Sequence, residues 1–236
     1  MIYFTKDKVF LIFCEVIVKT ASISIEDYLG AIYRLQQSAE TLLPLSELQE
    51  FFEFSPISIH EMVQKLESLG LAEYQPYRGV KLTEKGSESA QSLVRRHRIW
   101  EVFLADELHV PMGEAHQLAG DLEHAAPDWI TERLFEHLGE PDFCPHGSKI
   151  GDLAAPSSEI RLEGFLVGQP MVVTKIYPEK KIVLEQASNL GLIPGKRITL
   201  LIKNENESRV LLENKEEILT GDILNCIWGS KENHAE

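Results

Sequence analysis

The sequence predicts a mainly α-helical N-terminal part followed by a small all-β domain. Apolar residues recur at helical spacing through most of residues 23–138. Two of these helical segments follow each other closely and lead into a short β-hairpin pattern at residues 71–86. From residue 160 onwards, short apolar runs alternate with turn residues, which predicts five or six strands in a small barrel or sandwich.

Composition excludes some classes of function. The formal net charge of −14 argues against a general nucleic-acid binder, so any DNA contact has to be local. The three cysteines, Cys14, Cys144 and Cys226, are far apart and form no C-x-x-C pair. That pattern fits a reducing cytoplasm and predicts no thiolate zinc site.

Residues 1–22 contain an apolar run that is too short to span a bilayer and is interrupted by Glu15. No small-residue cleavage site of the secretory kind follows it. We therefore expect an N-terminal extension, with an extra strand or helix packed on the body as the alternative. We also expect a cytoplasmic protein with no membrane partner.

A helix is expected from Ser24, which can cap it, with Ile25, Leu29 and Ile32 on its apolar face. Asp27 falls in the first turn, where an acidic side chain favours the helix dipole. That structural reason is sufficient by itself, so a ligand role for Asp27 needs other support.

Residues 45–86 predict a helix, a turn, a second helix and a hairpin. The first helix covers residues 45–52, and the second begins at Pro56 after the cap Ser55 and ends at Gly70. Its inward residues are expected to be Ile59, Met62, Val63, Leu66 and Leu69. This is the order of a winged helix-turn-helix, whose second helix enters the major groove of DNA.

Candidate DNA contacts lie on the outward face of that helix and on the wing. Helix residues near the N-terminus can meet base edges, whereas wing residues can meet phosphates. The helix candidates are Ile57, Ser58, His60, Glu61, Gln64 and Lys65, and the wing candidates are Tyr77, Arg78 and Lys81. A winged helix used for protein contact is the alternative.

Residues 93–137 carry a pattern typical of metal chelation. His97 and Glu101 are four residues apart in a helical segment and share one face. After a break at Val110-Pro111, a second helical segment carries His116, Glu123 and His124. Imidazoles with carboxylates suit divalent ions such as Mn²⁺, Fe²⁺ or Zn²⁺. The alternative is that these residues are solvated or structural.

Four blocks together resemble one family, that of the diphtheria toxin repressor and the manganese transport regulator. They are SIEDYLGAIYRL, SPISIHEMVQKLESLGLAEYQPYRGVKLTEKG, LVRRHRIWEVFL and DLEHAAPD, within residues 23–145. The resemblance implies a homodimeric repressor that binds double-stranded operator DNA when loaded with Fe²⁺ or Mn²⁺ and controls metal-uptake genes.

The resemblance also implies two metal sites per subunit. His97, Glu101 and His116 match the ancillary site, and Asp27, Glu123 and His124 match the primary site. Asp27 takes the position that holds aspartate in the manganese-responding branch. The absence of thioether and thiolate from this set favours Mn²⁺, with Fe²⁺ as the alternative.

Two positions depart from the family pattern. Gly30 replaces a glutamate of the manganese regulator, and Gly120 replaces a cysteine or glutamate. Gly120 can offer only its backbone carbonyl, which predicts weaker binding or a different selectivity at the primary site.

The C-terminal part begins after a segment rich in glycine and proline, in which Cys144 and His146 are interpreted as structural. The phrase NLGLIPGKRITL resembles an SH3-like domain of the FeoA type. In some family members this domain lends ligands to the ancillary site, for which Glu179, Glu185 and Gln186 are nearby candidates.

Together these inferences predict a metal-dependent transcriptional regulator. The expected parts are an extension (1–22), a winged helix-turn-helix domain (23–92), a metal-binding and dimerisation helical domain (93–140), a linker (141–158) and an SH3-like domain (159–230). The competing hypotheses are a metal-independent winged-helix regulator and a metal-dependent enzyme, although no general base or substrate motif supports an enzyme.

Overall fold

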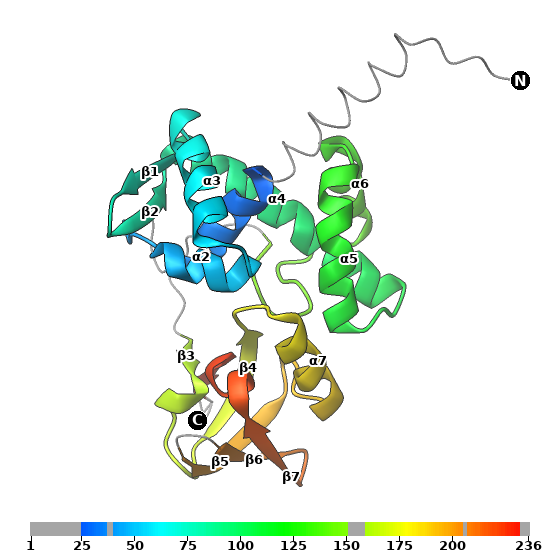
Figure 1. Cartoon of the computed structure of the whole chain (residues 1–236). Coiled ribbons are helices and arrows are strands. Elements are labelled where there is room, and N and C mark those ends of the chain that lie inside the picture. Colours follow the sequence, from blue (N-terminus) through cyan, green and yellow to red (C-terminus); the bar gives the residue numbers. More distant parts are fainter. Residues whose placement is uncertain (1–24, 37–39, 151–158, 205–206, 232–236) are drawn as a thin grey trace, which may run out of the picture. The chain divides into compact units, whose positions relative to one another are not determined.

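The computed structural model describes residues 25–36, 40–150, 159–204 and 207–231 (Figure 1). The chain divides into two compact units, one ending at Val94 and the other beginning at Arg95. This boundary falls within helix α4 (Glu84–Val102). The expected extension at residues 1–22 lies outside the described residues. No helix in the described ranges is long and apolar enough to cross a membrane.

The first unit has the predicted winged helix-turn-helix order. Helical residues 25–35 are followed by α2 (Leu45–Phe52), α3 (Pro56–Ser68) and the antiparallel hairpin of β1 (Ala72–Gln75) and β2 (Gly79–Leu82). Its core gathers apolar residues from each of these elements: Leu29, Ile32, Leu48, Ile59, Val63, Leu66 and Val80. The helical pattern of the sequence therefore corresponds to one buried face per helix.

Local chemistry fixes the ends of α3. Ser55 caps the helix by accepting a hydrogen bond from the Ser58 backbone N–H at 3.2 Å, and Pro56 occupies the first turn. The expectation that Leu69 points inward is wrong, because α3 ends at Ser68 and Leu69 is the exposed cap residue. Gly70, with a φ of 69°, then turns the chain away.

The second unit begins with helices. The last part of α4 continues into a π-helical turn (Phe103–Glu107), and α5 (Met112–Ala125) and α6 (Asp128–His137) follow. Pro111 precedes α5, at the predicted break. Ile99 and Val102 of α4 pack with Cys144 and Ile150, so residues of the Gly/Pro-rich segment form part of a buried core.

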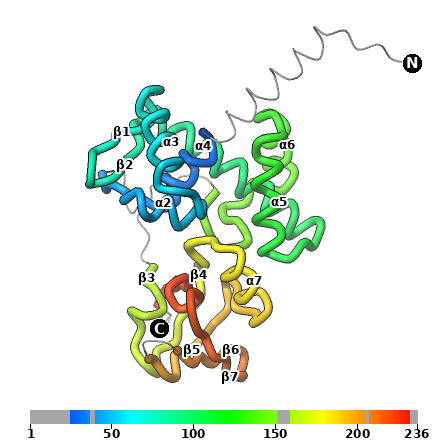
Figure 2. The backbone as a smooth tube through the Cα atoms, in the orientation of Figure 1, coloured from blue at the N-terminus to red at the C-terminus, as the bar shows by residue number. Residues whose placement is uncertain are grey.

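The rest of the second unit contains a six-stranded antiparallel sheet within the described residues. Figure 2 traces the backbone of this part of the chain from β3 onwards. In spatial order its strands are β3 (Ile160–Arg161), β8 (Ile227–Lys231), β4 (Pro170–Ile176), β5 (Arg197–Lys203), β6 (Glu207–Leu212) and β7 (Lys215–Thr220). Two short 3₁₀ turns (Leu162–Gly164 and Gly221–Asn225) complete the domain. The predicted helical part followed by a small β domain is confirmed.

One helix interrupts the β pattern. Residues Lys181–Leu190 form α7, where the sequence predicted only strands and turns. Val183, Leu184 and Ala187 are buried at helical spacing, and Gly191 ends the helix with a φ of 71°. Helix α7 packs on α5, where Gly113 leaves room for Glu185: a Cβ at Gly113 would lie 2.8 Å from Glu185 Cγ.

Candidate metal centre

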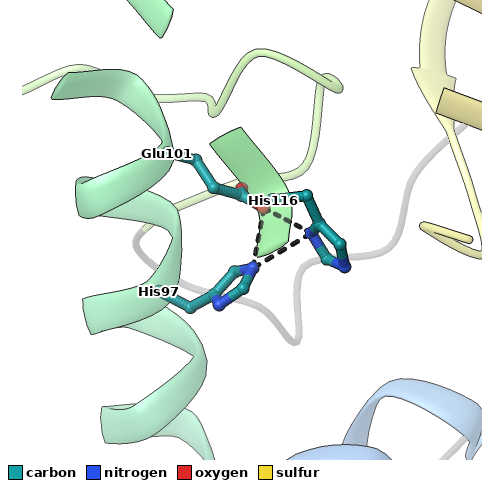
Figure 3. Close-up of side chains that lie close together, drawn as sticks. All are labelled: His97, Glu101 and His116. Atoms are coloured by element: carbon teal, nitrogen blue, oxygen red, sulfur yellow. Dashed lines mark hydrogen bonds and ion pairs between the residues drawn. The ribbon is translucent and has the colours of Figure 1, made fainter. Parts of the chain in front are cut away.

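Helix α4 places His97 and Glu101 one turn apart on a buried face. His97 Nε2 lies 2.7 Å from Glu101 Oε1. His116, from α5, completes the group, with its Nδ1 2.7 Å from Glu101 Oε1 and 3.1 Å from His97 Nε2 (Figure 3). Glu101 is fully buried and His97 is almost so. The helical spacing in the sequence therefore corresponds to three side chains that converge on one point.

Helix α5 also holds Glu123 and His124. Glu123 is buried, and its Oε2 lies 2.7 Å from Nδ1 of His97, the ring nitrogen that faces away from Glu101. Its other oxygen, Oε1, lies 3.5 Å from His124 Nε2. His97 thus has one nitrogen toward Glu101 and the other toward Glu123.

A loop brings two further residues, a cysteine and a histidine, that the sequence analysis interpreted as structural. Cys144 Sγ lies 3.3 Å from His146 Nδ1, and the same nitrogen lies 3.3 Å from Glu101 Oε2. The loop is tied to β4, because Ile176 donates its backbone N–H to the His146 carbonyl at 2.9 Å. The sequence predicted no thiolate zinc site, whereas the structure places the Cys144 thiol beside Glu101 and His146 among side chains that could hold a metal ion.

Glu179, which follows β4, is the one member of the three nearby candidates that lies at this place. Its Oε1 accepts a hydrogen bond from Ser148 Oγ at 2.6 Å and lies 3.9 Å from His146 Nδ1. Glu185 and Gln186 are exposed on α7, and Glu185 pairs with Lys181. We call the six residues that converge here the buried cluster: His97, Glu101, His116, Cys144, His146 and Glu179.

The charges of the buried cluster stabilise its carboxylates. Burial alone would raise the pKa of Glu101, but the neighbouring His146 and His97, with a hydrogen bond from His116, hold it well below its usual range. Burial likewise opposes ionisation of Glu179, yet the nearby Arg98 brings its pKa down to about 2. Burial lowers the pKa of His146, and the nearby Glu101 and Glu179 carboxylates oppose that effect.

The donor set and its spacing fit a divalent transition-metal ion. Ligand atoms about 2.0–2.3 Å from one ion lie roughly 3 Å from each other, and the contacts around Glu101 range from 2.7 to 3.3 Å. Among the described residues, the buried atoms without a hydrogen-bond partner include Glu101 Oε2 and Glu179 Oε2 of this cluster. Buried polar atoms without a partner are costly, and an ion coordinated at such a site would offset that cost.

The positions of the predicted second site fall in different units. Glu123, His124 and Gly120 belong to α5 of the second unit, while Asp27 belongs to helical residues 25–35 of the first. Space around the Cα of Gly120 is open, whereas a Cβ at Gly30 would lie 3.2 Å from Leu93 Cδ2.

The DNA-contact candidates belong to α3 and to the β1–β2 hairpin of the first unit. The exposed residues of α3 line a groove with α2, formed by Leu45, Gln49, Pro56, Ile57, His60, Glu61 and Gln64. Ser58 and Lys65 are exposed on the same helix. On the wing, Tyr77 and Arg78 are exposed. Lys81 instead lies 3.4 Å from both Glu40 and Glu73, so its charge is already engaged.

Comparisons with known proteins match both units. A family profile described as "Iron dependent repressor, N-terminal DNA binding domain" matches residues 21–80. Another, described as "Iron dependent repressor, metal binding and dimerisation domain", matches residues 83–152. The diphtheria toxin repressor of Corynebacterium glutamicum is 31% identical over 217 residues, which cover 86% of this chain and 93% of that protein.

Other relatives agree. The iron-dependent repressor IdeR of Mycobacterium leprae is 28% identical over 74% of this chain and 82% of its own. A solved manganese-dependent transcriptional repressor in complex with manganese has a TM-score of 0.78 at 26% identity, covering 88% of this chain and all of that one. The structure of ScaR with bound Zn²⁺ has a TM-score of 0.75 at 27% identity, and the match covers 88% of this chain and 99% of the ScaR chain.

Proposed function

Because this chain belongs to the iron-dependent repressor family of metal-dependent transcriptional repressors, we propose that it is a homodimer that binds operator DNA when loaded with Mn²⁺, with Fe²⁺ as the alternative ion. The family consists of transcriptional repressors and not enzymes, so the enzyme hypothesis is set aside. The genes it controls are proposed to be those of metal uptake, and its place of action the cytoplasm.

The buried cluster is the observation that supports this proposal most directly. Its residues come from α4, α5, the Cys144–Ser148 loop and the segment that follows β4, so an ion there would join four separate segments of the second unit. Two buried carboxylates in one cluster repel each other unless a cation is near. Ion binding would therefore order the part of α4 that runs on from the winged-helix unit.

We propose that Asp27, Glu123 and His124 hold the second ion, with the Gly120 carbonyl as a further oxygen. This ligand set of oxygen and imidazole nitrogen suits Mn²⁺, and its aspartate takes the place of a softer methionine. The buried cluster, which includes the Cys144 thiol, suits softer ions as well. Two sites of different character in one subunit follow from these ligand sets.

The DNA contacts are proposed to come from Ile57, Ser58, His60, Glu61, Gln64 and Lys65 of α3 and from Tyr77, Arg78 and Lys81 of the wing. Two copies of α3 in a dimer would enter successive major grooves. The ion pairs of Lys81 leave Arg78 as the more available phosphate contact.

The experiment is operator binding measured by fluorescence anisotropy at one fixed salt concentration, in chelator and then with Mn²⁺, Fe²⁺ without oxygen, or Zn²⁺. The DNA is the region upstream of the protein's own gene and of neighbouring metal-uptake genes. Switching by an ion from mostly unbound to mostly bound needs about a 10⁴-fold preference for the DNA-competent state. Equal binding in chelator and in metal would instead support a metal-independent winged-helix regulator.

The proposed role of Asp27 in ion preference has its own test. Replacing it by methionine introduces a soft thioether, and we expect the DNA-binding response to move from Mn²⁺ toward Fe²⁺. Asp27→Asn is the matched control, because it keeps an oxygen donor of the same size. An unchanged order of ion potency in Asp27→Met would show that Asp27 is not a selectivity ligand.

A further inference from the structure

The tip of the wing is a tight turn between β1 and β2 (Figure 1). Gln75, the last residue of β1, is paired with Gly79, and its backbone carbonyl accepts a hydrogen bond from the Arg78 N–H at 3.0 Å. Tyr77, at the tip, is fully exposed and has a φ of 63°, a value that non-glycine residues rarely adopt. The turn is therefore maintained against a local conformational cost, which is common where a chain binds a ligand.

This turn brings two side chains together. Arg78 Nη1 donates a hydrogen bond to Gln75 Oε1 at 2.8 Å. A guanidinium group has five N–H donors in one plane, so this bond uses one donor and leaves the others for a ligand. A long side chain loses rotamer freedom when it binds, and one that is already held loses less. Gln75 therefore orders the Arg78 side chain before any ligand arrives.

The base of the wing is tied to the rest of the first unit. The Leu43 N–H donates to the Val80 carbonyl at 2.8 Å, and the Val80 N–H donates to the Leu43 carbonyl at 2.9 Å. Glu67 of α3 accepts the backbone N–H of Tyr74 at 3.1 Å. The Tyr74 ring also meets the ring of His60, another α3 residue, edge to face with the centroids 5.4 Å apart. The wing is thus held in a fixed place relative to α3, within one compact unit.

We propose that Gln75 is a positioning residue for DNA binding, which orients the Arg78 guanidinium toward a phosphate of the DNA backbone. The inference rests on the proposed function, in which Arg78 contacts phosphate. The planar fork of arginine matches the oxygens of a phosphate group, so its orientation matters more than that of a point charge. Lys81 faces the carboxylates of Glu40 and Glu73, whereas Arg78 faces a neutral amide and keeps its full charge for DNA.

The test measures operator binding by the full chain in Mn²⁺, by fluorescence anisotropy over a series of salt concentrations. We expect Gln75→Ala to weaken binding by about 3- to 10-fold, because Arg78 then has to be ordered during binding. The slope of the logarithm of the binding constant against the logarithm of salt concentration should stay as in the wild type, because Arg78 still reaches a phosphate and releases a counterion. Arg78→Ala, in contrast, should lower that slope by about one.

Two comparisons separate positioning from general damage. In an Arg78→Ala background, Gln75→Ala should have no additional effect, because its action passes through Arg78. Gln169→Ala is the matched control, since the Gln169 side chain also accepts a hydrogen bond within a turn, from the Leu166 N–H at 3.1 Å, but lies in the second unit. It should bind operator DNA as the wild type does. Should Gln75→Ala not fold by circular dichroism, Gln75→Met, which keeps the length but has no oxygen acceptor, is expected to show the same loss.

The outcomes distinguish the inference from the function. An unchanged affinity in Gln75→Ala, a lowered salt slope in that variant, or the same loss with and without Arg78 overturns the positioning role and leaves metal-dependent DNA binding intact. A wild-type chain that binds operator DNA equally in chelator and in metal overturns the metal dependence alone. A wild-type chain that binds no operator DNA with any of the ions overturns the proposed function and the positioning role together.

Discussion

At the residue scale, the Cys144 thiol has the chemistry most open to direct measurement. Burial, with the nearby charges of Glu101 and Glu179, raises the pKa of this thiol well above its ordinary value of 9.0. The thiol is therefore protonated at neutral pH, whereas a metal ligand must be the thiolate. Binding of an ion through Cys144 must release a proton.

We expect calorimetric titrations with Zn²⁺ or Co²⁺, run in buffers of different ionisation enthalpy, to show this proton. The wild-type chain should release about one proton more per ion than Cys144→Ser, and its affinity should rise with pH. Equal proton release by the two proteins would show that the ion binds without Cys144. Cys226→Ser is the control, since that buried cysteine lies in the core of the β domain.

The other titratable groups of the cluster set the acid limit of stability. The folded-state pKa of His146 is below its ordinary 6.5 because of burial, and that of Glu179 is about 2 because the charge of Arg98 overcomes the opposing effect of burial. The unfolded chain therefore binds more protons at low pH, and stability falls as pH falls. The contribution of His146 is present above pH 6.5 and is lost below it, and that of Glu179 is lost between 4.5 and about 2.

Urea denaturation in chelator should therefore give a free energy of unfolding that decreases steadily from pH 7 to pH 4. His146→Gln, which cannot ionise, should flatten the part of this curve just below pH 6.5. A free energy of unfolding that increases on acidification would contradict the assignment, because it requires groups whose pKa is raised on folding.

The role of Gly120 can be tested by adding a carboxylate side chain at this position. It lies one turn before Glu123 and His124 on α5, and the space around it is open. We expect Gly120→Glu to raise Mn²⁺ affinity by about tenfold or more, since ligand charge strongly tunes cation affinity. Mn²⁺ binding measured by electron paramagnetic resonance checks this, with Gly120→Gln as the uncharged control.

At the element scale, the loop that carries Cys144 and His146 depends on Gly147. This glycine has a φ of 85°, and a Cβ there would lie 1.8 Å from the Thr174 backbone oxygen of β4. We expect Gly147→Ala to cost about 3 kcal/mol and to weaken binding of Co²⁺, because the loop must move away from β4. Gly139 has a similar positive φ, but no atom lies near its Cβ position, so Gly139→Ala should lower the free energy of unfolding by only about 1 kcal/mol. Similar losses of stability in both variants would argue against the close approach.

The same loop shows why part of the site could not be predicted from sequence. His97 and Glu101 share a helical face by spacing alone, so their proximity follows from local geometry. Cys144 and His146 are separated from Glu101 by more than 40 residues, and they meet it only through the packing of the loop on β4. No periodic pattern encodes that packing.

A similar limit applies to α7. Its residues include isoleucine, valine and leucine between turn segments, which is also a typical strand composition. Tertiary packing against α5 and the sheet decides in favour of helix. The winged helix, in contrast, was predictable because Ser55, Pro56 and Gly70 mark the ends of α3 locally.

Helix α3 and the wing are expected to contribute to DNA binding in different ways. Gln64→Ala should weaken operator binding by about 1–3 kcal/mol, because glutamine contacts base edges. It should also relax the specificity for the base pair that Gln64 contacts. Arg78→Ala should weaken binding to all DNA sequences. It should also reduce the slope of log binding constant against log salt concentration by about one, because one fewer counterion is released from the DNA. Binding measured over a series of salt concentrations and operator variants checks both. A change of base preference in Arg78→Ala would contradict the phosphate role.

At the scale of the whole molecule, the net charge of −14 has to be reconciled with DNA binding. Several acidic groups are engaged by the protein itself: Glu101 and Glu179 lie in the buried cluster, and Glu40 and Glu73 pair with Lys81. A divalent ion at each proposed site would add two positive charges. Metal loading at these proposed sites would therefore lower the repulsion between protein and DNA.

Dimerisation is the last requirement, and Trp129 of α6 provides its test. This side chain is 65% exposed within the region matched as a dimerisation domain, and a large exposed aromatic residue is typical of an interface. We expect Trp129→Ala to weaken the dimer by about 2 kcal/mol, or about 30-fold in its dissociation constant, as measured by analytical ultracentrifugation. Metal-dependent operator binding should weaken with it, since one subunit contacts only half of a symmetric site.

Ile218→Ser is the control, because Ile218 is an exposed apolar residue of β7 outside that region, and it should change neither measurement. A Trp129→Ala protein that dimerises normally would place the interface elsewhere.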